Sequence, residues 1–156
     1  MTAIADPAAG AVHASLRLEA PVERVFRALT DPKRLAQWWG QADQYRTSDW
    51  QVDLRPGGAW SCRTQSLRPG EEISGQGSVR GEFKRVEPPR LLEYTWSPSW
   101  DGFATTLVRI ELTPEGAGTR LKLRHTGFTS AAVCEDHARG WTGVLGWLEA
   151  KGVRAE

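Results

Sequence analysis

Two side chains capable of chemistry lie three residues apart near the C-terminus of the chain, Cys134 and His137. On a helix this spacing places both on one face, where the imidazole could activate the thiolate as a nucleophile or both groups could bind a metal ion. Because no third partner is evident in the sequence, packing of both side chains in the core is the favoured alternative. His125 follows Leu121 and Leu123 on the inward side of a predicted strand. It could place a hydrogen-bonding group in a cavity, or it could be a satisfied structural histidine.

Aromatic residues are the other unusual feature, because eight of the 156 residues are Trp. So many large rings are typical of a wide aromatic-lined interior or of a sticky surface. Several rings come from different predicted elements and could converge on one pocket for a flat or hydrophobic small molecule; alternatively they fill the core. Trp50 and Trp100 could instead be loop or surface residues, and an exposed Trp can mark a protein contact. The candidate ligand-binding residues are Trp39, Trp60, Phe83, Tyr94, Trp96, His125, His137, Trp141 and Leu145.

Other kinds of site are not indicated by the sequence. The chain contains no glycine-rich phosphate loop, no nucleophile elbow and no zinc-type ligand spacing, so we expect no catalytic residues, no metal and no cofactor. A net charge of +1 with both signs interspersed predicts no binding to nucleic acid or to an anionic membrane. No segment approaches the roughly eighteen apolar residues of a membrane span. Cys62 and Cys134 are far apart, which fits a reducing compartment and predicts a cytoplasmic protein.

The long helix that must position Cys134, His137 and Trp141 is predicted over residues 130–151, where apolar residues recur at steps of three and four. Ser130 is expected to cap its N-terminus and Gly152 its C-terminus. Three glycines, at positions 140, 143 and 146, interrupt this helix at a cost of about 0.8–1 kcal/mol each. They leave an indented strip, so either another backbone packs closely there or the helix forms one wall of a cavity.

The remaining elements are predicted from changes in period. A single domain is expected over residues 11–156, after a flexible tail at residues 1–10, and it is expected to be a monomer or a homodimer. Two short helices should begin at Pro21 and at Asp31-Pro32. Seven alternating segments predict a curved antiparallel sheet and an α+β fold, with strands near residues 12–19, 50–54, 60–64, 73–86, 91–96, 106–112 and 119–126.

Several segments together resemble a known family. They are residues 19–32 (EAPVERVFRALTDP), 35–40 (LAQWWG), 53–58 (DLRPGG), 81–83 (GEF), 88–91 (PPRL), 94–96 (YTW) and 140–141 (GW), with Leu145 and Leu148. This pattern, over about residues 12–151, is similar to that of bacterial relatives of the activator of the ninety-kilodalton heat-shock protein's ATPase. These proteins belong to the START-like (SRPBCC, birch-pollen-allergen-like) superfamily with the helix-grip fold. The resemblance implies that fold, and a hydrophobic-ligand carrier or sensor, a stress-related co-chaperone, or a cyclase, dehydratase or hydrolase.

Three functions are therefore compared. The first is a binding protein without catalysis that holds a small hydrophobic or aromatic ligand between the sheet and the long helix. The second is a module that binds a chaperone or another protein through an exposed aromatic patch. The third is a cyclase-type or hydrolase-type enzyme that uses His125, His137 or Cys134. An enclosed cavity that the histidines reach would favour the first or third, and a patch of exposed Trp would favour the second.

Overall fold

The elements come from a computed structural model that describes residues 1–40, 45–66 and 76–154. The helices are α1 (Val22–Thr30), α2 (Pro32–Trp38) and α3 (Ala131–Trp147), with short turns η1 (Pro7–Ala9), η3 (Ser99–Asp101) and η4 (Leu148–Gly152). The strands are β1 (Ile4–Asp6), β2 (Ala11–Leu18), β3 (Tyr45–Val52), β4 (Ala59–Ser66), β5 (Gln76–Glu87), β6 (Leu91–Pro98), β7 (Thr106–Glu115) and β8 (Gly118–Thr126).

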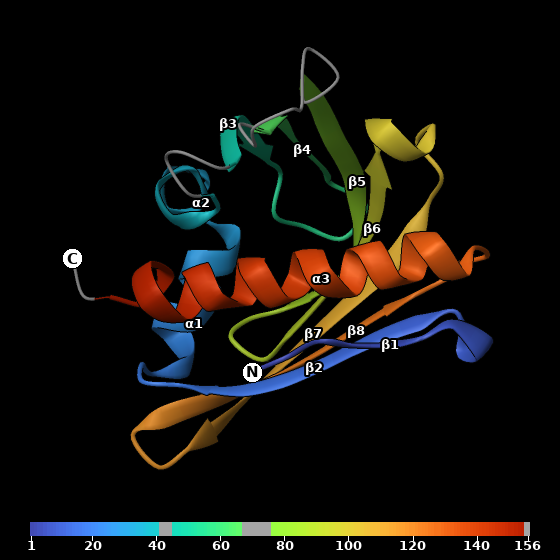
Figure 1. Ribbon diagram of the computed structural model, residues 1–156. Helices are drawn as coiled ribbons and strands as arrows, with labels where there is room; N and C mark the ends of the chain where they lie inside the picture. The colour runs from blue at the N-terminus through green and yellow to red at the C-terminus, as the bar shows by residue number, and fades with distance from the viewer. Residues whose placement is uncertain (41–44, 67–75, 155–156) are drawn as a thin grey trace.

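The strands form one antiparallel sheet in the order β1-β2-β8-β7-β6-β5-β4-β3. Figure 1 shows α3 running across one face of this curved sheet, with α1 and α2 near the C-terminal end of α3. The predicted α+β class is confirmed, as are the two short helices and the long C-terminal helix of a helix-grip fold. Each of the seven predicted strands has a counterpart in the structure, although residues 73–75 of one predicted strand lie outside the described residues.

The number of strands is a correction, because the sheet has eight strands and not seven. The additional strand, β1, lies within residues 1–10, where the sequence indicated only a flexible tail. It pairs with β2 at the sheet edge, and the Ala3 N–H donates a hydrogen bond of 2.9 Å to Oγ1 of Thr142 on α3. A strand of three residues is too short to show alternation, and its Ile4 is 65% exposed, so no hydrophobic pattern marked it.

The corner between α1 and α2 forms as the sequence predicts. Asp31 caps α2 by accepting a hydrogen bond of 2.9 Å from the Lys33 N–H, and Pro32 occupies the first turn, where its missing N–H has no cost. The indole N–H of the buried Trp38 then donates 2.8 Å to the Ala28 carbonyl on α1. This bond fixes the angle between the two helices and holds the next residue, Trp39, against the core.

The ends of α3 agree with the prediction only at the N-terminus. Ser130 Oγ accepts the Val133 N–H at 3.3 Å, as an N-cap residue does. Gly152 is not the C-cap residue, because the chain continues from α3 into the π-helical turn η4, which Val153 terminates. A Cβ atom on Gly152 would lie 2.9 Å from Trp38 Cγ, so glycine is required here to let η4 approach the ring.

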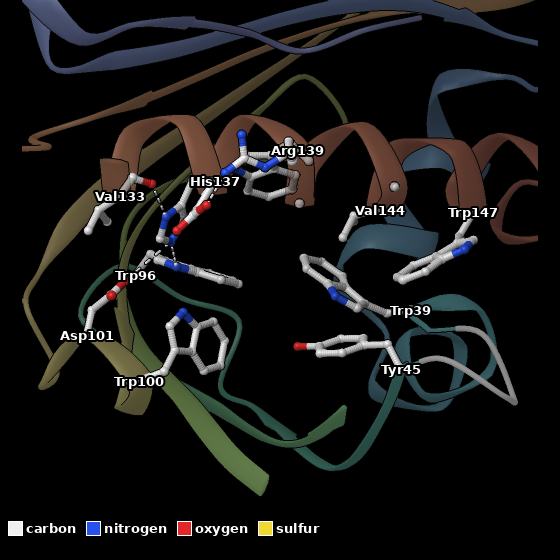
Figure 2. A pocket seen from close by; sticks show the side chains of 14 residues that line it. Trp39, Tyr45, Trp96, Trp100, Asp101, Val133, His137, Arg139, Val144 and Trp147 are labelled. Atoms are coloured by element: carbon white, nitrogen blue, oxygen red, sulfur yellow. Dashed lines mark hydrogen bonds and ion pairs between the residues drawn. The ribbon is translucent and has the colours of Figure 1, made fainter. Parts of the chain in front are cut away.

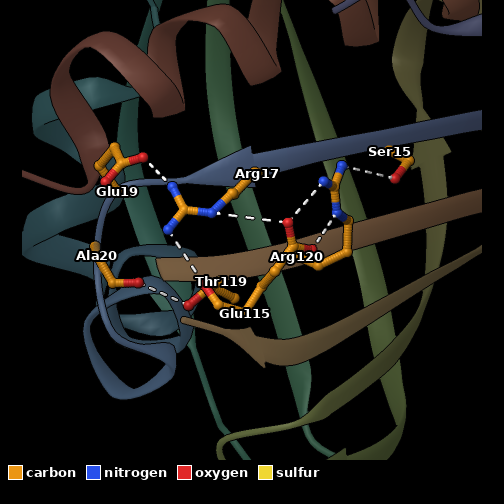
Figure 3. A network of polar contacts seen from close by, with 7 residues as sticks. All are labelled: Ser15, Arg17, Glu19, Ala20, Glu115, Thr119 and Arg120. Atoms are coloured by element: carbon orange, nitrogen blue, oxygen red, sulfur yellow. Dashed lines mark hydrogen bonds and ion pairs between the residues drawn. The ribbon is translucent and has the colours of Figure 1, made fainter. Parts of the chain in front are cut away.

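The outer face of the sheet is polar and carries cross-strand ion pairs (Figure 3). Arg120 donates two hydrogen bonds, of 2.8 and 3.0 Å, to the Glu115 carboxylate, which also lies 3.7 Å from Arg17 Nε. Arg120 holds the pKa of Glu115 below its ordinary value. Such exposed pairs contribute little stability, so the fold depends on the apolar residues of the inner face. The molecule therefore directs its large rings inward, toward α3.

Candidate functional site

A pocket of about 330 Å³ lies along α3 and opens between two groups of side chains. In Figure 2, Trp96, Trp100 and Asp101 stand on one side, Tyr45, Trp39 and Trp147 on the other, and α3 covers the pocket. Elements far apart in the chain thus form one site, namely α2, β3, β6, η3 and α3. The pocket is lined by Trp39, Tyr45, Trp96, Trp100, Asp101, Val133, Asp136, His137, Arg139, Gly140, Trp141, Gly143, Val144 and Trp147.

The glycines of α3 decide between the two predicted reasons for an indented helix surface. A Cβ atom built on Gly140, Gly143 or Gly146 would meet no other atom within 4 Å, apart from its neighbours and the backbone of its own helix. Within residues 1–40, 45–66 and 76–154, no second backbone packs closely against them, so that alternative is wrong. Gly140 and Gly143 line the pocket, and the helix is one of its walls.

Three indole rings form the inner wall of the pocket. The ring centroids of Trp39 and Trp96 are 6.2 Å apart at an interplanar angle of 21°, and Trp141 lies 5.8 Å from Trp39 and 5.9 Å from Trp96. Such distances are those of favourable aromatic pairs. All three rings are buried, so the wall is part of the core.

His137 fixes the orientation of Trp96. The Trp96 indole N–H donates to His137 Nε2 at 3.2 Å, and His137 Nδ1 lies 2.9 Å from the Val133 carbonyl. A carbonyl only accepts, so Nδ1 carries the ring proton and Nε2 is the acceptor. The lone pair of Nε2 therefore binds an indole N–H and is not directed at the pocket as a free base.

His125 fixes Trp141 in the same way from behind the wall. The Trp141 indole N–H donates to His125 Nδ1 at 2.9 Å, so the proton of the neutral imidazole is on Nε2. Nε2 lies 2.6 Å from Oγ1 of Thr106, which donates in turn to the Trp96 carbonyl at 3.2 Å. Burial lowers the pKa of His125 well below its ordinary value. His125 is thus a neutral, fully bonded core residue that holds a pocket residue in place.

Cys134 does not form a pair with His137. Its thiol donates to the Ala11 carbonyl of β2 at 3.3 Å, on the sheet side of α3, whereas His137 contacts Trp96 on β6. Burial raises the pKa of the Cys134 thiol, which keeps it protonated. The structure therefore favours the core alternative for Cys134 over the activated nucleophile.

The predicted binding residues are divided between several places. Trp39, Trp96, His137 and Trp141 line the pocket together. Three others surround a separate gap of about 20 Å³ on the far side of Trp39 and Trp96, namely Trp60, Phe83 and Tyr94. Leu145 is buried in the core, and His125 lies behind the pocket wall. The sequence thus identified the aromatic interior but not the partition that Trp39 and Trp96 make between the two spaces.

Several pocket residues are not among the predicted binding residues, and part of this set carries a signal in the sequence. Asp136, Gly140, Gly143 and Trp147 recur at steps of four, three and four, which is one helix face beside the apolar stripe. The predicted indentation includes Gly140 and Gly143 of this face but not Asp136 or Trp147, because glycine and aspartate are not part of an apolar stripe. Tyr45, Trp100 and Asp101 come from β3 and from the turn after β6, and no helical spacing connects them.

The charged groups of the pocket lie at its mouth. Arg139 forms an exposed ion pair with Asp136, one turn earlier on α3. Asp101 Oδ2 lies 3.9 Å from His137 Nε2. Burial raises the pKa of the Tyr45 phenol, so this group is a neutral hydroxyl beside the cavity. The lining is therefore mostly aromatic, with two carboxylates and one guanidinium at the edge.

Within residues 1–40, 45–66 and 76–154, no group of three or more His, Cys, Asp and Glu side chains could hold a metal ion. None of the helices in the same ranges has the length and apolar character needed to cross a membrane.

Comparisons with known proteins identify one family. The model of a family described as "Activator of Hsp90 ATPase homolog 1-like protein" matches residues 19–151. No curated protein matches the chain. Among solved structures, protein CV1439 from Chromobacterium violaceum is 25% identical with a TM-score of 0.80, covering 94% of this chain and 99% of its own. CalU16 from Micromonospora echinospora is 29% identical with a TM-score of 0.66, covering 92% of this chain and 75% of its own. An AHSA1-like protein from Aeromonas hydrophila is 25% identical with a TM-score of 0.68, covering 92% of this chain and 96% of its own.

Proposed function

Because the chain belongs to the family of activator of Hsp90 ATPase homolog 1-like proteins, we propose that it holds a small hydrophobic or aromatic molecule in the pocket beside α3. The family fold supports either a ligand-binding or a co-chaperone-like module. The observation that favours ligand binding is the pocket of about 330 Å³, a volume within the range of small-molecule sites. We propose Trp39, Trp96, His137 and Trp141 as its binding residues, together with Tyr45, Trp100 and Trp147.

The energetics of binding favour a largely apolar ligand. Burying about 200 Å² of apolar ligand surface at about 25 cal/mol per Å² would supply near 5 kcal/mol before the costs of association. The rings of Trp96 and Trp141 are already held by hydrogen bonds to His137 and His125, so binding does not have to immobilise them. A wall ordered in advance lowers the cost of association.

We expect no catalysis in this pocket, and the hydrogen bonds of the histidines support this expectation. A general base needs a lone pair that reaches the substrate proton. The lone pair of His137 Nε2 accepts the Trp96 N–H, and that of His125 Nδ1 accepts the Trp141 N–H. The Cys134 thiol is buried against Ala11. The buried free thiols of Cys62 and Cys134 also support the proposal of a reducing, cytoplasmic location.

The alternative function is binding to a chaperone or another protein, and the observation that favours it is Trp100. This residue is 51% exposed, as an interface anchor would be in the free protein. Its ring also lines the pocket, so ligand binding accounts for the same position. The other large hydrophobic residues exposed in the described part of the chain are Met1, Ile4 and Leu54, none of which is aromatic.

Thermal unfolding with a panel of flavonoids, fatty acids, sterols and aromatic polyketides tests the proposal. A ligand at a hundredfold excess over its Kd adds about 2.7 kcal/mol of stability. For a chain of this length that corresponds to an increase in Tm of about 5–11 °C. The same compound should quench Trp fluorescence saturably, because indole rings line the pocket. If no compound class changes either signal, ligand binding of these classes is refuted, and direct binding assays with purified chaperones become the relevant experiment.

A further inference from the structure

We infer that the ligand carries a positive charge: the chemistry of the pocket fits an alkylammonium or quaternary ammonium group attached to an apolar body. This inference rests on the proposed function, because it assigns the class of molecule that the same pocket takes. Two independent features support it, namely the aromatic faces around the cavity and the sign of the charges at its mouth.

Two of the three rings of the inner wall offer π surface without a free hydrogen-bond donor. The indole N–H of Trp96 is bound by His137, and that of Trp141 is bound by His125. What these two rings leave for a ligand is their carbon surface, whose faces carry negative electrostatic potential. Trp100 lies on the same side of the cavity as Trp96, and Tyr45 lies on the opposite side with Trp39 (Figure 2). The rings therefore come from several directions, as in sites that bind quaternary ammonium ions.

Among the described lining residues, one cationic group is available to an anionic ligand. The guanidinium group in the lining, Arg139, is mostly exposed and already paired with Asp136. A carboxylate or phosphate bound there would have to compete with this ion pair. An uncharged ligand without O–H or N–H groups would make no use of the carboxylates.

The charges at the mouth favour a cation. The lining contains the two carboxylates of Asp101 and Asp136 and the guanidinium of Arg139, while His137 is neutral. Within the part of the chain that the structure describes, Asp101 forms no ion pair with a Lys or Arg side chain, and the ring of His137 is 3.9 Å away. Asp101 is therefore the carboxylate available to an ammonium group, and it adjoins Trp100 in η3.

The test compares benzyltrimethylammonium with neopentylbenzene, which has the same shape but carries a quaternary carbon in place of the nitrogen. Affinities are measured by quenching of Trp fluorescence and by the change in Tm. Because a desolvated cation–π contact and a nearby carboxylate both act only on the cation, we expect it to bind at least about tenfold more tightly than its isostere. Added salt should weaken binding of the cation and leave the isostere unaffected.

Two variants on the exposed turn η3 locate the effect without disturbing the core. Asp101→Asn and Trp100→Leu should each weaken binding of benzyltrimethylammonium by about threefold to tenfold and change the affinity of neopentylbenzene by less than about twofold. Glu23→Gln is the matched control, because it makes the same change in net charge on the exposed face of α1. It should leave both affinities unchanged.

Each other result overturns the inference. If both compounds bind equally, or the uncharged one binds more tightly, the ligand class is wrong although the pocket still binds small molecules. If neither compound binds while a member of the flavonoid, fatty acid, sterol or polyketide panel does, the cationic ligand is refuted and the proposed function stands. If neither compound nor any member of the panel binds, both proposals fail.

Discussion

Gly143 offers the most direct test of the pocket, because a side chain there would occupy the cavity and leave the core intact. The Cβ of a substituted residue 143 would meet no atom of the described part of the chain within 4 Å, apart from its neighbours and its own helix backbone. The position also lines the pocket. In Gly143→Leu the isobutyl group should extend into the space of about 330 Å³ that the ligand would use. The substitution also replaces a poor helix former with a good one.

The two effects of Gly143→Leu have opposite signs, which makes the test sharp. Helix propensity should raise the stability of the free protein by about 0.6–1 kcal/mol, or about 1–4 °C in Tm. Binding should weaken by at least about tenfold, since the ligand must give up the volume that the leucine fills. Ordinary destabilising substitutions lower both quantities, so a loss of binding with a gain in Tm cannot come from partial unfolding.

Gly146→Leu is the matched control for this experiment. Gly146 lies on the same helix, and its Cβ would also meet open space, but the residue does not line the pocket. The assay is thermal unfolding of the wild type and both variants, with and without the panel compound that stabilises the wild type most. Gly146→Leu should raise Tm and retain the ligand-induced shift. Equal ligand shifts in both variants would refute the location of the site, and a lower Tm in Gly143→Leu would refute the open space beside α3.

Three further predictions concern the residues that support the pocket. The pKa of His125 in the folded protein lies below its ordinary value of 6.5, so the folded state binds fewer protons than the unfolded state as the pH falls. The contribution of His125 to the free energy of unfolding should be fully present above about pH 6.5 and should decrease below it, as measured by urea titrations between pH 7.5 and 5. This dependence on pH should be absent from His125→Gln. An unchanged dependence in the variant would contradict the assignment. Thr106→Val removes the acceptor of the His125 Nε2–H, and the free energy of unfolding in urea should fall by about 1–3 kcal/mol. Thr105→Val, at the exposed neighbouring position, should lower it by less. Equal losses would count against the hydrogen-bond chain. Gly152→Ala should lower the free energy of unfolding by about 1–3 kcal/mol, because its Cβ would lie 2.9 Å from Trp38 Cγ. Gly146→Ala should raise it. No change in stability in Gly152→Ala would show that η4 can move away from the ring.

Local chemistry explains which parts of the fold the sequence could predict. Ser130 and the Asp31-Pro32 pair act on backbone groups within a few residues, so their roles follow from sequence alone. Strand β1 is held by its pairing with β2 and by Thr142, far away in the chain, and no local pattern marks it. The ending of α3 depends in the same way on the approach of η4 to Trp38.

The sequence indicated that aromatic residues face the interior, but not which of them line the same pocket. Alternation shows that Trp60 and Trp96 both face inward, but it does not show that one lies beside a small gap and the other beside the pocket. Which space an inward-facing strand residue reaches depends on how the sheet curves around α3, and this curvature is a property of the whole fold. Trp100 and Asp101 reach the pocket from a turn, where no period applies.

The hydrogen bonds behind the pocket wall form one directional chain that begins and ends on α3. It runs from the Trp141 N–H through His125 and Thr106 to the carbonyl of Trp96, and from the Trp96 N–H through His137 to the carbonyl of Val133. Each group in the chain donates to the next one. Reversing the direction of one hydrogen bond alone would therefore place two donors or two acceptors opposite each other. We therefore expect these positions to change together in evolution. Homologues that replace His125 should also replace Trp141 or Thr106.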